Sequence, residues 1–326
     1  RTSGVGVRHD VRVGVRGFFA DRLDLVARVA EEVDRIVGRS HATRGHDLDL
    51  RGALENLLAH RHPAGIDAVD HARRANDNLA ETVRQYPDRF GGFATLATQD
   101  PDAAVVELRR AVDDLGLMGA LINGHTHGRY LDDPAYGPLF ATAEALGVPI
   151  YLHPTTPHPA VMDAWFAPYV DQGLHLASWG FAVEAGTHAL RLIYSGLFDR
   201  YPNLQMILGH LGEMLPFKAF RTDRYYGLGG SGGSGGLLQK RPSEYLRNNF
   251  YFTTSGNFSP PAMACTLEVM GADRVMFSVD YPMDDNVDGA NFLATYPMDD
   301  ADRRKVGYEN AVRLFGSRIP GFGARA

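Results

Sequence analysis

Short apolar segments alternate with amphipathic stretches along most of the chain, from about Ala75 onward. Six of these segments are rich in β-branched and aromatic residues, which is typical of strands. They are FGGFATLA (90–97), MGALING (118–124), VPIYLH (148–153), QMILGH (205–210), NFYFTTS (249–255) and RVMFSVD (274–280). Strands that alternate with helices at this spacing predict a series of parallel β–α–β units.

The ends of two helices are marked between the predicted strands. The Asp-Pro pair at 100–101 is typical of an N-cap followed by a first-turn proline, and Gly116 is expected to end that helix. A second Asp-Pro pair at 133–134 opens the next helix, and Gly147 is expected to end it.

The first part of the chain is patterned less regularly. Residues 4–15 alternate like a strand, and residues 19–37 carry apolar side chains at helical spacing. Two strands there would complete a (β/α)8 barrel, so we predict residues 1–74 as the N-terminal part of the barrel and residues 75–326 as the remainder. A doubly wound sheet is the alternative, but no G-x-G-x-x-G follows a predicted strand. The segment GLGGSGGSGG at 227–236 has no strand before it and predicts a flexible loop.

Composition narrows the class of protein. The 326 residues carry a net charge of −6, which gives no basic surface for nucleic acid or an anionic membrane. No apolar run approaches the roughly 18 residues that a membrane span needs. The single cysteine, Cys265, excludes an intrachain disulfide and fits a reducing compartment. We therefore expect a cytoplasmic enzyme with no nucleic-acid or membrane partner.

Three predicted strands end in a polar residue that can bind a metal. They end in His153, His210 and Asp280. Active sites of barrels lie at the carboxyl ends of the strands, and imidazole with carboxylate suits Zn2+, Mn2+ or Fe2+. Any one of the three alone is more simply a buried, hydrogen-bonded residue, but three at corresponding strand ends indicate a shared site.

Further polar residues surround these strand ends. Glu213 is expected one helical turn beyond His210, and Arg221 two turns beyond Glu213, so that both face one side. A carboxylate orients an imidazole, and a guanidinium binds a substrate carboxylate. The alternative is a helix N-terminal glutamate that complements the dipole, and a solvated arginine. Asn123, near the end of its strand, is placed to orient a substrate oxygen, and His188 is expected to pack against a helix.

Several segments together resemble the amidohydrolase-related family, and most closely its hydroxybenzoate decarboxylases. These segments are ARRANDNLAE, GALINGHTHGRYLDDP, VPIYLHP, WGFAVEAGTHALRLIYSGLFDRYPNLQMILGHLGEMLPF, RPSEYLRNNFYFTTSG, VMFSVDYPM and ENAVRLF. The resemblance runs from about Ala75 to Phe315. It implies a metal-dependent (β/α)8 barrel, a small aromatic acid as substrate, and assembly as a homodimer or homotetramer.

The resemblance also implies roles for individual residues. His153 and Asp280 would bind one divalent metal ion, Zn2+ or Mn2+, and Asp280 would also donate a proton to the substrate ring. His210 would be the active-site histidine with Glu213 as its partner. Arg221 would bind the substrate carboxylate or reach a neighbouring subunit.

The N-terminal segment departs from the family pattern. Family members begin with a strand carrying Glu-x-His, which supplies two further metal ligands. No such motif stands here; His9 can replace the histidine, while Val7 occupies the position of the glutamate. His153 and Asp280 alone are one ligand short of the usual catalytic set of three.

Three functions are compatible with the sequence. The first is nonoxidative decarboxylation of a 2-hydroxybenzoate-type acid. The second is hydrolysis of a lactone, an amide or a C–C bond, in which Asp280 would activate a water molecule as general base. The third is a metal-free, inactive barrel with a binding role, which the missing Glu-x-His would explain.

Overall fold

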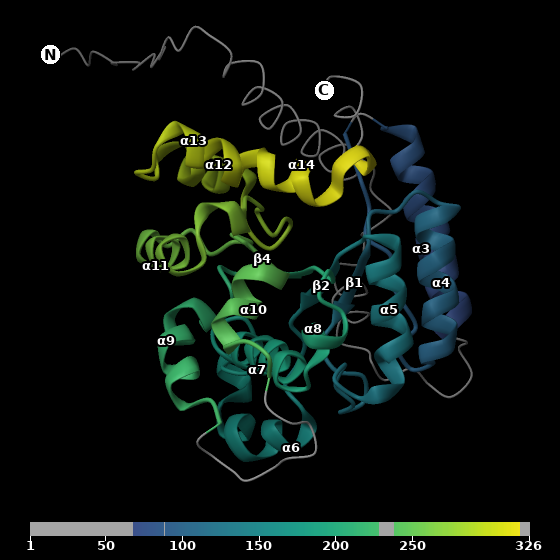
Figure 1. Ribbon diagram of the computed structural model, residues 1–326, viewed down its shortest axis with the longest axis horizontal. Coiled ribbons are helices and arrows are strands. Elements are labelled where there is room, and N and C mark those ends of the chain that lie inside the picture. The colour runs from purple at the N-terminus through teal and green to yellow at the C-terminus, as the bar shows by residue number, and fades with distance from the viewer. Residues whose placement is uncertain (1–67, 88, 228–237, 320–326) are drawn as a thin grey trace, which may run out of the picture. The chain divides into compact units, whose positions relative to one another are not determined.

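The computed structural model describes residues 68–87, 89–227 and 238–319 of the chain (Figure 1). These residues all belong to one compact unit, Leu48–Ala326. The predicted N-terminal strand and helix, with His9, lie outside the described residues, and so does the Gly/Ser-rich segment after Gly227. The predicted division at residue 74 therefore stays a prediction.

Five parallel strands form the sheet, in the order in which they occur along the chain. They are β1 (Ala120–Asn123), β2 (Ile150–His153), β3 (Met206–Leu208), β4 (Phe250–Thr253) and β5 (Val275–Met276). A doubly wound sheet reverses its strand order at a switch point, where ligands bind. The described strands show no reversal, so their order is that of a barrel and excludes the doubly wound alternative for this part of the chain.

The segment predicted as a strand at 90–97 pairs with the sheet at a single residue. Ala94 forms a parallel bridge with Ala120, through hydrogen bonds from Ala94 N to Gly119 O (2.8 Å) and from Leu121 N to Ala94 O (2.9 Å). The two glycines at 91–92 favour strand structure weakly, which explains the short pairing. Five of the six predicted strands are confirmed, and the sixth is reduced to a bridge that lies in strand position beside β1.

Helices and single turns connect the strands. Before β1 lie α3 (Ala68–Gln85) and α4 (Pro101–Asp113), and before β2 lie η1 (Pro134–Tyr136) and α5 (Gly137–Leu146). The β2–β3 connection contains α6 (Pro159–Val161), η2 (Met162–Phe166), η3 (Ala167–Gln172), α7 (Gly180–Tyr194) and α8 (Leu197–Arg200). Next come α9 (Leu215–Tyr225), α10 (Pro242–Asn249), α11 (Pro260–Met270) and η4 (Ala272–Arg274). After β5 follow α12 (Asn286–Thr295), α13 (Asp300–Arg304), η5 (Lys305–Glu309), α14 (Asn310–Phe315) and η6 (Gly316–Arg318). None of the described helices has the length and apolar character to cross a membrane.

Three of the four predicted helix ends are confirmed by their caps, whereas α4 ends at Asp113 with Asp114 as its C-cap, before the predicted Gly116. The Asp100 side chain accepts a hydrogen bond from Ala103 N, and Asp133 caps η1 in the same way, directly before α5. Gly147 ends α5 in the left-handed conformation, with φ 61°. Helices α3, α4 and α5 pack side by side, and α9 packs against both α10 and α11 (Figure 1).

Alternation along each strand separates two faces of the sheet. On β2, Ile150 and Leu152 are fully buried and pack with helix residues such as Phe140. Burial of each such side chain stabilises the fold by about 1.5–3 kcal/mol. Tyr151 and His153 point to the opposite face, which in a barrel is the interior. The site residues therefore lie on the interior face, at the carboxyl ends of the strands.

Candidate active site

The structure brings the three predicted strand-end residues together. His153 ends β2, while His210 and Asp280 follow β3 and β5. The ring centroids of His153 and His210 are 6.4 Å apart, and His210 Nε2 lies 3.7 Å from Asp280 Oδ2. Asn123, the last residue of β1, is the register partner of His153. The four residues thus lie at the same end of the sheet, at the ends of β1, β2, β3 and β5.

The Nε2 atom of His153 is available to bind a metal ion, because Nδ1 is the ring nitrogen that makes a hydrogen bond. Nδ1 lies 2.8 Å from the Pro154 carbonyl oxygen. A carbonyl can only accept, so Nδ1 carries the proton and Nε2 keeps its lone pair. Burial lowers the pKa of His153 and favours the neutral ring. This neutral, oriented imidazole is the form that binds metal ions.

The turn that carries His210 is left-handed. The φ angles of His210, Leu211, Gly212, Glu213 and Met214 are 51°, 59°, 89°, 50° and 66°. A left-handed conformation costs about 1–2 kcal/mol at each residue other than glycine. The expectation that Glu213 lies one helical turn beyond His210 is therefore wrong, because α9 begins only at Leu215.

Hydrogen bonds to the turn hold this strained backbone. Leu211 N donates to Thr253 O at the end of β4 (2.8 Å), and Thr266 Oγ1 donates to Leu211 O (3.1 Å). Asn257 Nδ2 donates to His210 O (3.2 Å). Strain that the surrounding structure holds in this way is characteristic of functional sites.

His210 lies between two carboxylates. Its Nδ1 is 2.5 Å from Oε1 of Glu213, which is only 4% exposed, and its Nε2 faces Asp280. Burial alone would lower the pKa of His210, but Asp280 and Glu213 outweigh it and raise the pKa to about 10. The contact with His210 lowers the pKa of Asp280 in turn. His210 is therefore an imidazolium that lies between the carboxyl groups of Glu213 and Asp280.

The two predicted substrate-binding residues differ in their placement. Asn123 is half-buried, and its Oδ1 is a buried acceptor with no hydrogen-bond partner within the described part of the chain. Arg221 is exposed on α9, with its guanidinium carbon 4.8 Å from the ring centroid of Tyr225. Arg221 and the buried Glu213 do not share a helix face, because the left-handed turn separates Glu213 from α9.

A group of hydroxyls beneath the site was not predicted from the sequence. Tyr151 Oη lies 2.8 Å from Thr253 Oγ1 and 3.0 Å from Ser255 Oγ. Ser255 Oγ lies in turn 2.7 Å from Ser278 Oγ. These contacts tie β2 to β4 and to the segment after β5. They fix the spacing of the strand ends that carry His153 and Asp280.

The sequence contains a signal for two of these hydroxyls. Residues two apart on a strand share a face. Tyr151 precedes His153 by two residues, and Ser278 precedes Asp280 by two. Counting back two residues along each predicted strand from the candidate ligand therefore identifies both hydroxyls.

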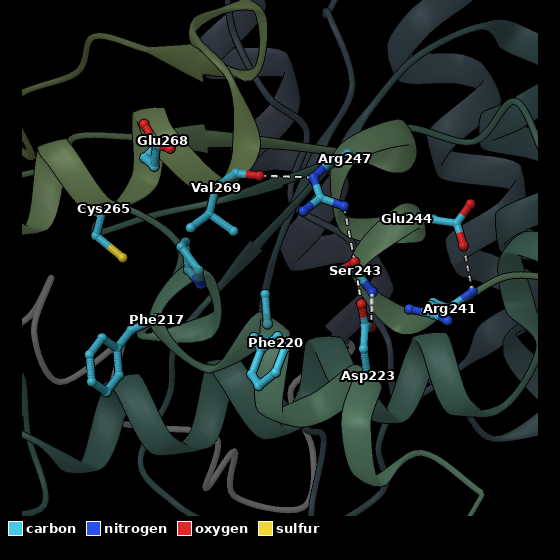
Figure 2. A pocket seen from close by; sticks show the side chains of 12 residues that line it. Phe217, Phe220, Asp223, Arg241, Ser243, Glu244, Arg247, Cys265, Glu268 and Val269 are labelled. Carbon is cyan, nitrogen blue, oxygen red and sulfur yellow. Dashed lines mark hydrogen bonds between the residues drawn. The ribbon is translucent and has the colours of Figure 1, made fainter.

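A groove of about 730 Å³ lies elsewhere, between α9, α10 and α11. Figure 2 shows Phe217 and Phe220 of α9 at this groove, with Arg247 of α10 across from them. Arg247 is already engaged, since its Nε donates to Val269 O (2.8 Å) and its Nη1 to Ser243 Oγ (3.0 Å). The groove is not lined by the strand-end group and offers no comparable chemistry.

Two residues at the strand ends can serve as ligands of a divalent metal ion. His153 Nε2 and the Asp280 carboxylate are donors of the types that Zn2+ and Mn2+ take. Over the described ranges, no group of three His, Cys, Asp or Glu side chains is arranged to hold a metal. A complete set of three protein ligands would need a donor from the rest of the chain.

The chain belongs to the amidohydrolase family. A family model described as "Amidohydrolase" matches residues 62–317. The gamma-resorcylate decarboxylase of a Rhizobium species is 43% identical over 297 residues, which cover 84% of this chain and 86% of that protein.

Solved structures agree with this assignment. A 2,6-dihydroxybenzoate decarboxylase in complex with 2,6-dihydroxybenzoate is 41% identical, with a TM-score of 0.69 over 76% of this chain and 77% of that one. A dihydroxybenzoic acid decarboxylase from a Polaromonas species, with bound manganese and 2-nitroresorcinol, is 37% identical, with a TM-score of 0.72 over 83% and 86% of the chains. These matches confirm the predicted (β/α)8 barrel of the amidohydrolase superfamily.

Proposed function

We propose that the protein is a metal-dependent, nonoxidative decarboxylase of a hydroxylated aromatic acid of the 2-hydroxybenzoate type. The observation that carries this proposal is the convergence of His153, His210 and Asp280 at the carboxyl ends of three barrel strands. The relatives described above support it, because their names include gamma-resorcylate and 2,6-dihydroxybenzoate decarboxylase.

His153 and Asp280 would hold one divalent metal ion, Zn2+ or Mn2+. When bound, the metal would orient the carboxylate and the adjacent phenolic oxygen of the substrate and polarise them. The manganese in the Polaromonas structure supports Mn2+. His9 is the sequence candidate for a third ligand.

In this proposal Asp280, once protonated, transfers its proton to the ring carbon that bears the carboxylate. That carbon becomes tetrahedral, the bond to the carboxylate then breaks, and its electron pair restores the aromatic ring as CO2 leaves. His210 Nε2, which lies 3.7 Å from Asp280 Oδ2, returns a proton to Asp280 when the two groups close to hydrogen-bond distance, and water then returns a proton to His210. Glu213 keeps the imidazole oriented and charged for this step. Asn123 orients a substrate hydroxyl group, which donates to its unpaired Oδ1.

We further propose assembly as a homodimer or homotetramer, in which Arg221 serves a neighbouring subunit. Arg221 is exposed, and two aromatic residues on the same helix, Phe217 and Phe220, are 80% and 82% exposed. Exposed apolar groups that lie together are typical of protein interfaces. An arginine among them can bind a carboxylate in the facing subunit.

We also propose that the protein is cytoplasmic and that its binding partner is a small aromatic acid. The single cysteine, Cys265, supports a reducing compartment. The net charge of −6 favours neither nucleic acid nor an anionic membrane surface.

A hydrolase of the same superfamily is the second candidate. The lowered pKa of Asp280 favours it, because an ionised carboxylate is the form that acts as a general base on water. The same residues would then cleave a lactone, an amide or a C–C bond.

One assay separates the two candidates. Protein loaded with Mn2+ or Zn2+ is incubated with a panel of 2-hydroxybenzoates, lactones and aryl amides. Release of CO2 together with the matching phenol supports the decarboxylase. Hydrolysis of a lactone or an amide, with no CO2 from any acid, refutes it in favour of the hydrolase.

A further inference from the structure

Two buried side chains of helix α7 form hydrogen bonds with the loop that follows β1. Glu184 and His188 lie one turn apart on α7 and are 4% and 0% exposed. The Tyr130 hydroxyl donates to Glu184 Oε2 (2.9 Å), and the backbone N–H of Leu131 donates to His188 Nε2 (2.9 Å). Two consecutive residues of the loop are thus fixed to one face of one helix.

The Tyr130 ring is held on several sides. The guanidinium of Arg191, also on α7, lies 4.3 Å from the ring centroid and forms two 2.9 Å hydrogen bonds to Asp132. The ring of His188 meets it edge-on at 4.9 Å, and the ring of His158 lies nearly parallel at 6.3 Å. These contacts leave the ring one orientation, with its hydroxyl directed at Glu184.

The loop after β1, which is hydrogen-bonded to α7, begins at the active site. Gly124, its first residue, follows Asn123 directly and donates its N–H to His153 O (2.8 Å). Helix α7 also reaches the other side of the site, because a Cβ on Gly186 would lie 2.9 Å from Glu213 O. The same helix therefore contacts the loop after Asn123 and the turn that carries His210.

This arrangement costs stability. Glu184 Oε1 and His188 Nδ1 are buried and have no hydrogen-bond partner among the residues that the structure describes. Buried polar groups left without a partner are unfavourable, and a leucine or phenylalanine would pack here without that cost. Polar groups kept in a core against their cost indicate a functional constraint.

We propose that Tyr130, Glu184 and His188 are positioning residues, a clamp on α7 that fixes the loop after β1 and with it the Asn123 side chain at the substrate. This inference rests on the proposed decarboxylase function, which supplies the substrate oxygen that Asn123 orients. None of the three residues touches the reacting atoms; they act through Asn123.

At mildly acidic pH the side chains of Glu184 and His188 are both uncharged. Burial raises the pKa of Glu184 to about 7, although the Tyr130 hydroxyl, the backbone N–H of His158 and the charge of Arg191 oppose the rise. Burial also lowers the pKa of His188 to about 3, so that its ring is neutral. The titratable and charged groups that surround Glu184 are Tyr130, Asp132, His125, His158, His188 and Arg191.

A double-mutant cycle in the full-length, Mn2+-loaded enzyme tests the clamp. Tyr130→Phe is expected to raise KM for the 2-hydroxybenzoate about five- to tenfold and to leave kcat within about twofold. Added to Asn123→Ala, it is expected to raise KM no further, because both changes remove the same contact. The control is Tyr245→Phe, which removes another buried hydroxyl, one that lies on α10 and donates to Asp199 away from this loop, and is expected to leave KM unchanged.

Amide hydrogen exchange without substrate provides a readout that needs no activity. Tyr130→Phe is expected to speed exchange of the Leu131 amide at least about tenfold, and Tyr245→Phe is expected to leave it unchanged. Additive effects of Tyr130→Phe and Asn123→Ala on KM, or unchanged Leu131 exchange, would overturn the clamp. If the wild type releases no CO2 while Leu131 exchange responds as expected, the decarboxylase proposal fails. The claim that α7 fixes the loop after β1 is then still supported.

Discussion

Glu213 Oε1 lies 2.5 Å from His210 Nδ1, although the backbone that joins them is left-handed at every residue. A right-handed helical turn also brings side chains three residues apart together, but here the chain bends the other way before α9 begins. Contacts from Thr253, Thr266 and Asn257 hold this turn. The charge state of His210 thus depends on a backbone that the rest of the barrel has to stabilise.

Removal of the Glu213 charge tests the electrostatic part of this relationship. Glu213→Gln retains the shape and a hydrogen-bonding oxygen but removes one of the two carboxylates beside His210. We expect the pKa of His210 to fall from about 10, and kcat to fall about 10²-fold. NMR titration of the imidazole measures the first effect. An unchanged pKa would show that Asp280 alone sets the charge of His210.

The left-handed turn is tested at Gly212. A Cβ there would lie 2.8 Å from Phe252 Cδ1 and 2.9 Å from Pro216 Cδ, at a φ of 89°. We expect Gly212→Ala to destabilise the fold by about 2–4 kcal/mol, from the combined clash and backbone strain. Gly147→Ala is the matched control, since that site has φ 61° and nothing within 4 Å of an added Cβ. It should cost only about 1–2 kcal/mol in urea unfolding, and equal losses for both variants would argue against close packing at the turn.

The pH dependence of stability tests the state of Glu184. Its pKa in the folded chain is about 7, above the ordinary value of 4.5, so folding takes up a proton between these values. The resulting stabilisation is fully present below about pH 4.5 and is lost as the pH rises through about 7. Glu184→Gln lacks this dependence. Relative to the variant, the wild type should lose stability between pH 5 and pH 8 in urea titrations, and parallel curves would contradict the raised pKa.

Metal content separates an enzyme from an inactive barrel. We expect about one divalent metal ion per chain in elemental analysis, and loss of activity after chelation that returns with Mn2+ or Zn2+. His153→Ala should lose the metal, while His127→Ala, at an exposed position in the loop after β1, should keep it. Purified wild type that neither contains nor binds a metal would favour a binding role.

The sequence predicts the strand ends well because two physical rules act there together. An apolar strand that ends in His153 or Asp280 marks both the burial of the strand and the carboxyl end at which barrels place polar groups. The same rules extend two residues back to Tyr151 and Ser278. The caps at Asp100 and Gly147 were predictable because each depends on its own side chain or on the lack of one.

The left-handed turn was not predictable in this way. The segment 210–214 contains one glycine among residues that form ordinary helices, and its conformation depends on partners from β4 and α11 that are distant in sequence. The predicted shared face of Glu213 and Arg221 failed for that reason. The clamp of Tyr130 by Glu184 spans 54 residues, and no local pattern indicates such a contact.

The most direct test of the proposed chemistry follows 2,6-dihydroxybenzoate by NMR in D2O, with the Mn2+-loaded protein. We expect release of CO2 and formation of 1,3-dihydroxybenzene with one deuterium at the carbon that carried the carboxylate. Asp280→Asn, which cannot deliver that proton, should form neither product. If the wild type leaves the acid and other 2-hydroxybenzoates intact while it binds metal and substrate, the decarboxylase assignment is wrong.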